Sequence, residues 1–99
     1  MEILVARLLT GEEVLGKCVS NSEENVVTFE NLVTVQQGPS KNNPESTTIF
    51  LSPFAPLSDS KKISLNKTQI LCMYAPIVEL LNKYNSVFGS GIILPKTIA

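Results

Sequence analysis

Apolar and polar residues alternate over most of the first 75 positions, and this period of two is typical of half-buried β-strands. It predicts strands over residues 3–9, 13–20, 26–36, 46–54, 61–65 and 70–74. Short polar turns separate the first three strands, which is typical of an antiparallel meander, and residues 37–45 form an exposed loop. Pro53 and Pro56 interrupt the fourth strand, so residues 61–65 are expected to continue it after a kink.

Gly16 lies inside the second predicted strand, between Leu15 and Lys17. Glycine weakens a strand interior and usually marks a bulge, a bend or a close approach of backbones. A sheet formed by so short a chain can close on itself only if its strands bend sharply. We therefore expect Gly16 to be a bend in the second strand of a small barrel.

Beyond Pro76 the apolar positions recur at helical spacing. The apolar stripe consists of Ile77, Leu80, Leu81, Tyr84 and Phe88. Residues 89–91, Gly-Ser-Gly, end this helix, and an apolar tail at residues 92–95 requires a surface to cover it. The pattern predicts a single all-β domain over residues 1–99, with a strongly bent antiparallel barrel over about 2–75 and a short helix and tail over about 76–99.

Composition agrees with one globular domain, because 43% of the 99 residues are hydrophobic. No apolar run approaches the ~20 residues of a membrane-spanning helix, and the first residues do not resemble a signal peptide. We therefore expect a cytoplasmic protein with no membrane partner. Cys18 and Cys72 both fall in apolar strand-like runs, where each is expected to be a small buried side chain.

The chain contains no histidine, and Asp59 is its only aspartate. The usual nucleophile–histidine pairs and most zinc sites are therefore excluded, and the sequence has no phosphate-binding glycine motif. We expect no enzyme activity, no catalytic or metal-binding residues and no cofactor.

Charge is distributed unevenly along the chain. Residues 1–30 hold six glutamates against one arginine and one lysine, a balance of −4, whereas residues 31–99 hold six lysines against three acidic residues, a balance of +3. The two parts of the fold are therefore expected to differ in electrostatic sign.

The segment from Leu8 to Val35 resembles the first sequence motif of the Sm/LSm family, whose members form RNA-binding rings of small bent barrels related to the SH3 barrel. The matching residues are Leu8, Gly11, Val14, Gly16, Cys18, Asn25 and the strand that begins at Val26. The second motif, an Arg-Gly turn between the last two strands, falls at Asn66 and Lys67. The whole chain is most similar to the compact Sm-like proteins of marine cyanophages and related T-even-type phages.

The sequence departs from this family at several positions. The loop between Gly16 and Asn25 is one residue shorter than usual, Asn21 takes the place of the conventional aspartate, and Glu23 stands where many members have a base-stacking side chain. Asn66 and Lys67 replace Arg-Gly, and the expected helix follows the barrel, whereas in most members a helix precedes it.

The resemblance implies a five-stranded Sm-like barrel that assembles into a cyclic homo-oligomer and binds single-stranded RNA, or DNA, at the inner rim of the ring. The residues carried over from the family pattern are Asn21, Glu23, Asn25, Asn66 and Lys67. The resemblance also implies a role in nucleic-acid processing or regulation, in the cytoplasm of a bacterial host if the protein is carried by a phage.

A second interpretation is a phage structural or protein-interaction scaffold that binds a host or phage protein and no nucleic acid. The acidic first 30 residues favour this interpretation, because Glu23 and Glu24 would repel phosphate. The lysines of the remaining chain favour nucleic acid.

Overall fold

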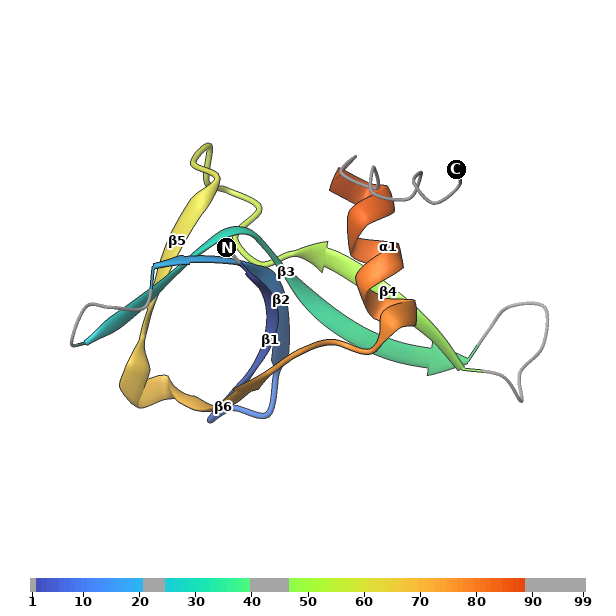
Figure 1. The fold of residues 1–99 in the computed structure, drawn as a ribbon, viewed down its shortest axis with the longest axis horizontal. Helices are drawn as coiled ribbons and strands as arrows, with labels where there is room; N and C mark the ends of the chain where they lie inside the picture. Colours follow the sequence, from blue (N-terminus) through green and yellow to red (C-terminus); the bar gives the residue numbers. More distant parts are fainter. Residues whose placement is uncertain (1, 21–24, 40–46, 89–99) are drawn as a thin grey trace.

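A computed structural model describes residues 2–20, 25–39 and 47–88 of the chain. Its elements are β1 (Glu2–Leu8), β2 (Glu13–Ser20), β3 (Val26–Pro39), β4 (Thr47–Pro53), β5 (Lys62–Asn66), the 3-10 turn η1 (Lys67–Gln69), β6 (Ile70–Tyr74) and α1 (Val78–Phe88) (Figure 1). The predicted all-β class with one short C-terminal helix is confirmed. No helix among the described residues is long and apolar enough to cross a membrane.

All strand pairs are antiparallel and form one sheet in the order β4-β3-β2-β1-β6, with β5 also paired to β3. Figure 1 shows the sheet curling so that β5, η1 and β6 come round to face β1 and β2. Among the described strands β5 and β6 are not paired with each other. The sheet is therefore curled but open.

The predicted fourth strand is present in two pieces, so the sheet has six strands. β4 pairs with the second half of β3, from Val33 onward, and β5 pairs with its first half, Val26 to Glu30. β4 ends at Pro53, and residues 54–61 leave the sheet before β5 begins. The two pieces share one partner strand, but the eight residues 54–61 leave the sheet where a simple kink was predicted. β3 itself continues to Pro39, into the segment predicted as loop, because β4 pairs with it there.

The predicted bend at Gly16 is confirmed. Leu15 pairs with Val33 and Lys17 pairs with Glu30, so Asn31 and Leu32 of β3 both lie opposite Gly16. This is a β-bulge, which bends a strand and increases its twist. Asn31 has a positive φ of 54°, which marks the turning point of β3.

Gly16 also allows the two backbones to approach closely at this bend. A Cβ atom added at Gly16 would lie 2.9 Å from Cδ1 and 3.3 Å from Cα of Leu32, and 3.3 Å from Cβ of Phe29. These distances are shorter than ordinary van der Waals contacts. The absence of a side chain is therefore a steric requirement at this position.

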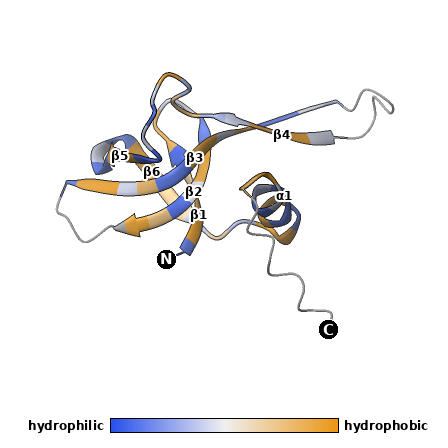
Figure 2. Ribbon diagram, turned by 90° about the horizontal axis from the view of Figure 1, so that it is seen from above, coloured by the Kyte–Doolittle hydropathy of each residue, from blue (hydrophilic) through white to orange (hydrophobic). Residues whose placement is uncertain are grey.

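The sheet buries side chains on both of its faces. The inner cluster, within the curl, is formed by Ala6, Leu8, Val14, Val27, Phe29 and Leu32, with side chains of β5 and β6 packed against it. The outer cluster is formed by Val5, Leu15, Val33, Leu80 and Tyr84, and it packs β1, β2 and β3 against α1. Figures 1 and 2 show α1 outside the curl. Successive residues Val5 and Ala6 thus enter different clusters, as strand alternation requires.

Tyr84 fixes α1 to the bend of β3. Its side chain is almost fully buried, and its hydroxyl donates to the carbonyl oxygen of Asn31 at 2.8 Å, with the carbonyl oxygen of Glu30 at 3.2 Å. Burial raises the pKa of Tyr84 to about 12, and the charge of Glu30 contributes to the increase. Of the predicted helical stripe, Leu80 and Tyr84 are buried, whereas Ile77 and Phe88 remain exposed.

The prediction of two buried cysteines is half wrong. Cys18 is half-buried and packs against the inner cluster, but Cys72 is exposed. Cys72 pairs with Arg7 of β1, and their side chains share the outer face of the sheet. An apolar run at an edge strand does not ensure burial, because nothing among the described residues covers this part of the outer face.

Replacement of Gly16 by alanine tests the steric requirement at the bend. Gly16→Ala is expected to lower the free energy of unfolding by about 1–3 kcal/mol, because the added Cβ overpacks Leu32. Gly38→Ala is the matched control, since a Cβ there meets only Phe50 at 3.4 Å. Urea denaturation followed by circular dichroism measures both, and equal effects of the two substitutions would contradict the assignment.

Candidate functional site

Three of the five predicted site residues come together at one end of β5. Asn66 ends β5 and pairs with Val26 of β3, immediately after Asn25. The backbone N–H of Lys67 donates to the carbonyl oxygen of Asn25 at 2.8 Å. These three residues are called the Asn25–Lys67 turn below. Asn21 and Glu23 lie outside the described residues.

Asn66 has a structural task within this turn. Its Oδ1 accepts hydrogen bonds from the backbone N–H of Thr68 at 3.0 Å and from the Thr68 hydroxyl at 2.8 Å. The side chain therefore caps η1, as asparagine does at helix N-termini. Since its oxygen is engaged, the amide nitrogen is the group that this exposed side chain offers to a ligand.

A shallow pocket of about 250 Å³ lies beside the Asn25–Lys67 turn. Its lining residues are Val27, Lys67, Ile70, Leu71, Cys72 and Met73. This volume is below the usual range for sites of drug-sized molecules, so the pocket suits at most a small group or one end of a larger ligand. Sequence reasoning missed the β6 side chains here, although the uninterrupted apolar run 70–73 next to a polar turn is a visible signal.

The lysines do not gather at this turn within one chain. Lys62 begins β5 and Asn66 ends it, a separation of about 13 Å along an extended strand. Lys61 lies at the far end too, where its carbonyl oxygen accepts a hydrogen bond from the N–H of Asn31. Lys62 pairs in register with Glu30, which also faces Lys17. Lys67 is thus the lysine that the strand pairing places at the turn.

The only arginine of the chain is engaged elsewhere, on the outer face of the sheet. Nη2 and Nε of Arg7 donate to one carboxylate oxygen of Glu13 at 2.6 and 3.1 Å, and the hydroxyl of Tyr74 donates to the same oxygen at 3.0 Å. The hydrogen bond from Arg7 lowers the pKa of Glu13, and the same bond raises the pKa of Arg7. The charge of the Arg7 guanidinium is thus balanced locally by the Glu13 carboxylate.

The described residues contain no group of three or more His, Cys, Asp or Glu side chains that could hold a metal ion. No known protein-family model matches the chain, and no curated protein matches it in sequence.

Substitutions at Asn66 test its capping role. Asn66→Ala is expected to lower the free energy of unfolding by about 1 kcal/mol, because two hydrogen bonds to Thr68 are lost. Asn66→Asp keeps an acceptor oxygen and is expected to change stability by less than half as much. Urea denaturation measures both variants, and equal losses of stability would show that the cap does not depend on this oxygen.

Proposed function

We propose that this chain is a ring-forming Sm-like protein that binds single-stranded RNA, or single-stranded DNA, through the Asn25–Lys67 turn. The observation that carries the proposal is the meeting of Asn25, Asn66 and Lys67 beside an unpaired strand edge. These residues come from the two segments that the Sm/LSm resemblance selects, and they lie far apart in the sequence.

Two features of the sheet support assembly into a ring. Within the described residues, β6 pairs only with β1, and β4 and β5 pair only with β3, so both sides of the open sheet retain an unpaired edge. Such edges readily pair with strands of another chain. If β6 of one copy paired with the β4–β5 edge of the next, the backbone groups of both unpaired edges would form hydrogen bonds. Repetition of this contact would close a ring.

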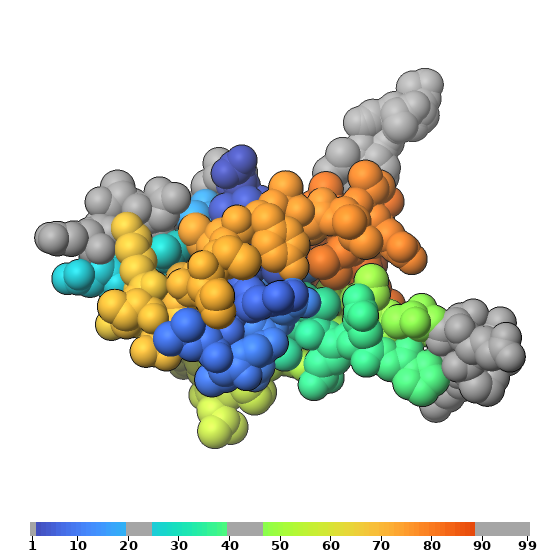
Figure 3. Space-filling view, turned by 90° about the horizontal axis from the view of Figure 1, so that it is seen from below, coloured from blue at the N-terminus to red at the C-terminus, as the bar shows by residue number. Residues whose placement is uncertain are grey.

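Exposed apolar side chains lie near the same edges. Leu71 and Tyr74 of β6 are 59% and 43% exposed, Ile77 just beyond β6 is 64% exposed, and Phe50 of β4 is 48% exposed. Figure 3 shows β6 and the residues after it at the surface between the first strands and α1. Contact between copies at these edges would remove this apolar area from water.

The turn offers two kinds of contact to a single strand of nucleic acid. The amides of Asn25 and Asn66 can hydrogen-bond to base edges, and the ammonium group of Lys67 can neutralise phosphate. The unstacked bases of a single strand expose Watson–Crick edges that are occupied by pairing in a duplex. A ring would present the turn once per subunit, which converts weak contacts into linked ones.

A protein-interaction scaffold is the second candidate, and two observations favour it. Arg7 is neutralised by Glu13, and Lys61 and Lys62 lie at the opposite end of β5 from Lys67. A ring without a dense positive surface would bind a host or phage protein through its apolar edges and its acidic N-terminal third.

Binding of nucleic acid is tested by fluorescence anisotropy with labelled oligo(U), oligo(A) and single-stranded DNA at low and moderate salt. We expect binding that weakens as salt increases, because phosphate contacts release counterions. Lys67→Glu and Asn25→Ala are each expected to weaken it at least fivefold.

Lys83→Glu is the matched control, because it makes the same charge change at an exposed position of α1. Equal weakening by Lys67→Glu and Lys83→Glu would indicate only a net-charge effect. No binding of any of the three probes at low salt would overturn the nucleic-acid function and leave the scaffold.

Assembly is tested by replacement of an exposed apolar side chain at the β6 edge. Leu71→Lys is expected to weaken self-association at least tenfold, because it places a charge where copies are proposed to pair. Leu57→Lys is the control, since Leu57 is 99% exposed in the 54–61 excursion. Sedimentation velocity over a range of concentrations measures the change, and a wild-type chain that remains monomeric would overturn the ring.

A further inference from the structure

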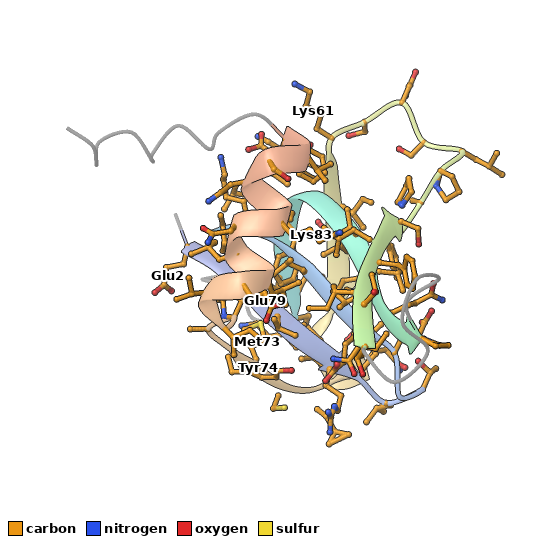
Figure 4. All side chains as sticks on the ribbon, turned by 90° about the vertical axis from the view of Figure 1, so that its right-hand side faces the viewer. Glu2, Lys61, Met73, Tyr74, Glu79 and Lys83 are labelled. Atoms are coloured by element: carbon orange, nitrogen blue, oxygen red, sulfur yellow. The ribbon has the colours of Figure 1, made fainter. Side chains whose placement is uncertain are left out.

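An apolar groove of about 460 Å³ lies at the end of β5 opposite the Asn25–Lys67 turn. The 54–61 excursion, the bend of β3 and the C-terminal end of α1 surround it. Its apolar wall includes Leu32, Val33, Leu51, Ile63, Val87 and Phe88, and its rim includes Ser58, Asp59, Ser60 and Lys61. Figure 4 shows Lys61 near the end of α1 that lies farthest from Met73 and Tyr74.

The groove is open in the described part of the chain. Val87 and Phe88, the last two residues of α1, line it and are 55% and 36% exposed. Its volume lies within the usual range of pockets that bind a ligand or a short peptide segment. Contact of such a surface with another apolar group is favourable, because both surfaces are removed from water.

The chain itself continues from the mouth of the groove with a segment of matching chemistry. Residues 89–99 lie outside the described residues, and their sequence is Gly-Ser-Gly-Ile-Ile-Leu-Pro-Lys-Thr-Ile-Ala. Two glycines in the first three positions permit the chain to reverse direction directly after Phe88, because glycine adopts positive φ without steric cost. The next three residues are all aliphatic.

Length also matches the groove. Three extended residues span about 10 Å, which is the scale of a cavity this size. The rim carries one acidic and one basic side chain, Asp59 and Lys61, so it presents no net charge to Lys96, which follows shortly after the aliphatic residues. A tether of three residues holds the segment at a high effective concentration, which favours the same chain over a free partner.

We propose that Ile92, Ile93 and Leu94 occupy this groove in the same chain. This contact removes the apolar wall of the groove from water. The Asn25–Lys67 turn and the outer edge of β6 lie elsewhere, so this inference does not depend on the proposed function.

The first test uses paired substitutions in the full-length chain, at a concentration where it is monomeric. Ile93→Asp is expected to lower the folding equilibrium constant about tenfold, as the loss of one partly buried aliphatic side chain does. Ile98→Asp, outside the aliphatic triplet, is the control and is expected to change it less than twofold.

The groove side of the contact has its own matched pair. Val87→Asp is expected to reduce the folding equilibrium constant, because Val87 lines the groove. Val78→Asp is the control and is not expected to reduce it, since Val78 is 70% exposed on the same helix and does not line the groove. If Ile93 and Val87 meet in the groove, the folding equilibrium constant of the double variant falls by clearly less than the product of the two single decreases. Independent, multiplicative losses, or equal losses for Ile93→Asp and Ile98→Asp, would overturn the proposal.

Nuclear Overhauser effects provide a direct readout that does not depend on stability. In isotope-labelled protein we expect contacts between the methyl groups of Ile93 or Leu94 and those of Val33 or Ile63. The absence of these contacts would overturn the proposal. Their appearance between labelled and unlabelled chains in a mixed sample would instead assign the segment to a neighbouring copy, which would also overturn it.

Discussion

The close approach of β2 and β3 at Gly16 is the constraint on which the rest of the fold depends. β3 must pair with β5 over its first half and with β4 over its second half, while β2 follows it through the change of direction. Asn31 and Leu32 accommodate the turn by sharing one position opposite Gly16. A Cβ atom at Gly16 would lie too close to Leu32 and Phe29, so the side chain and backbone of β3 would have to shift at the bend.

Tyr84 joins this bend to the second layer of the protein. The Tyr84 hydroxyl lies within hydrogen-bond distance of the carbonyl oxygens of Glu30 and Asn31, at the bulge of β3. The same ring fills the outer cluster with Val5, Leu15 and Val33. Burial favours the neutral phenol, which is why its pKa lies well above that of a free tyrosine. Tyr84 thus couples the packing of α1 to the bend of β3.

Sequence pattern was sufficient for the features that local chemistry determines. Alternation and apolar runs located the strands, Gly16 marked the bend, and helical spacing selected a stripe in which Leu80 and Tyr84 are buried. Pattern failed where burial depends on what lies across the sheet. Cys72 is exposed because α1 does not reach the outer face of β6, and β3 extends to Pro39 because β4 pairs with it.

In the candidate site, too, local sequence determines some features and strand pairing determines the others. Its members were selected from a family resemblance, and their meeting requires the register in which Asn66 pairs with Val26, which no local pattern provides. The cap from Asn66 to Thr68 was not foreseen, because it depends on the backbone angles of η1. The groove beside Phe88 exists only because residues 54–61 leave the sheet, a consequence of splitting one strand into β4 and β5.

Charge determines what a nucleic-acid function would require of this fold. The single arginine is held by Glu13, and the strand pairing leaves Lys67 apart from Lys61 and Lys62. One lysine contributes about one counterion to the salt dependence of binding, which is too little for useful affinity by a monomer. Useful affinity therefore requires several copies of the turn on one strand of nucleic acid, with an effective concentration set by their spacing. Nucleic-acid binding by this protein would therefore depend on ring assembly, whereas the scaffold interpretation needs the apolar edges alone.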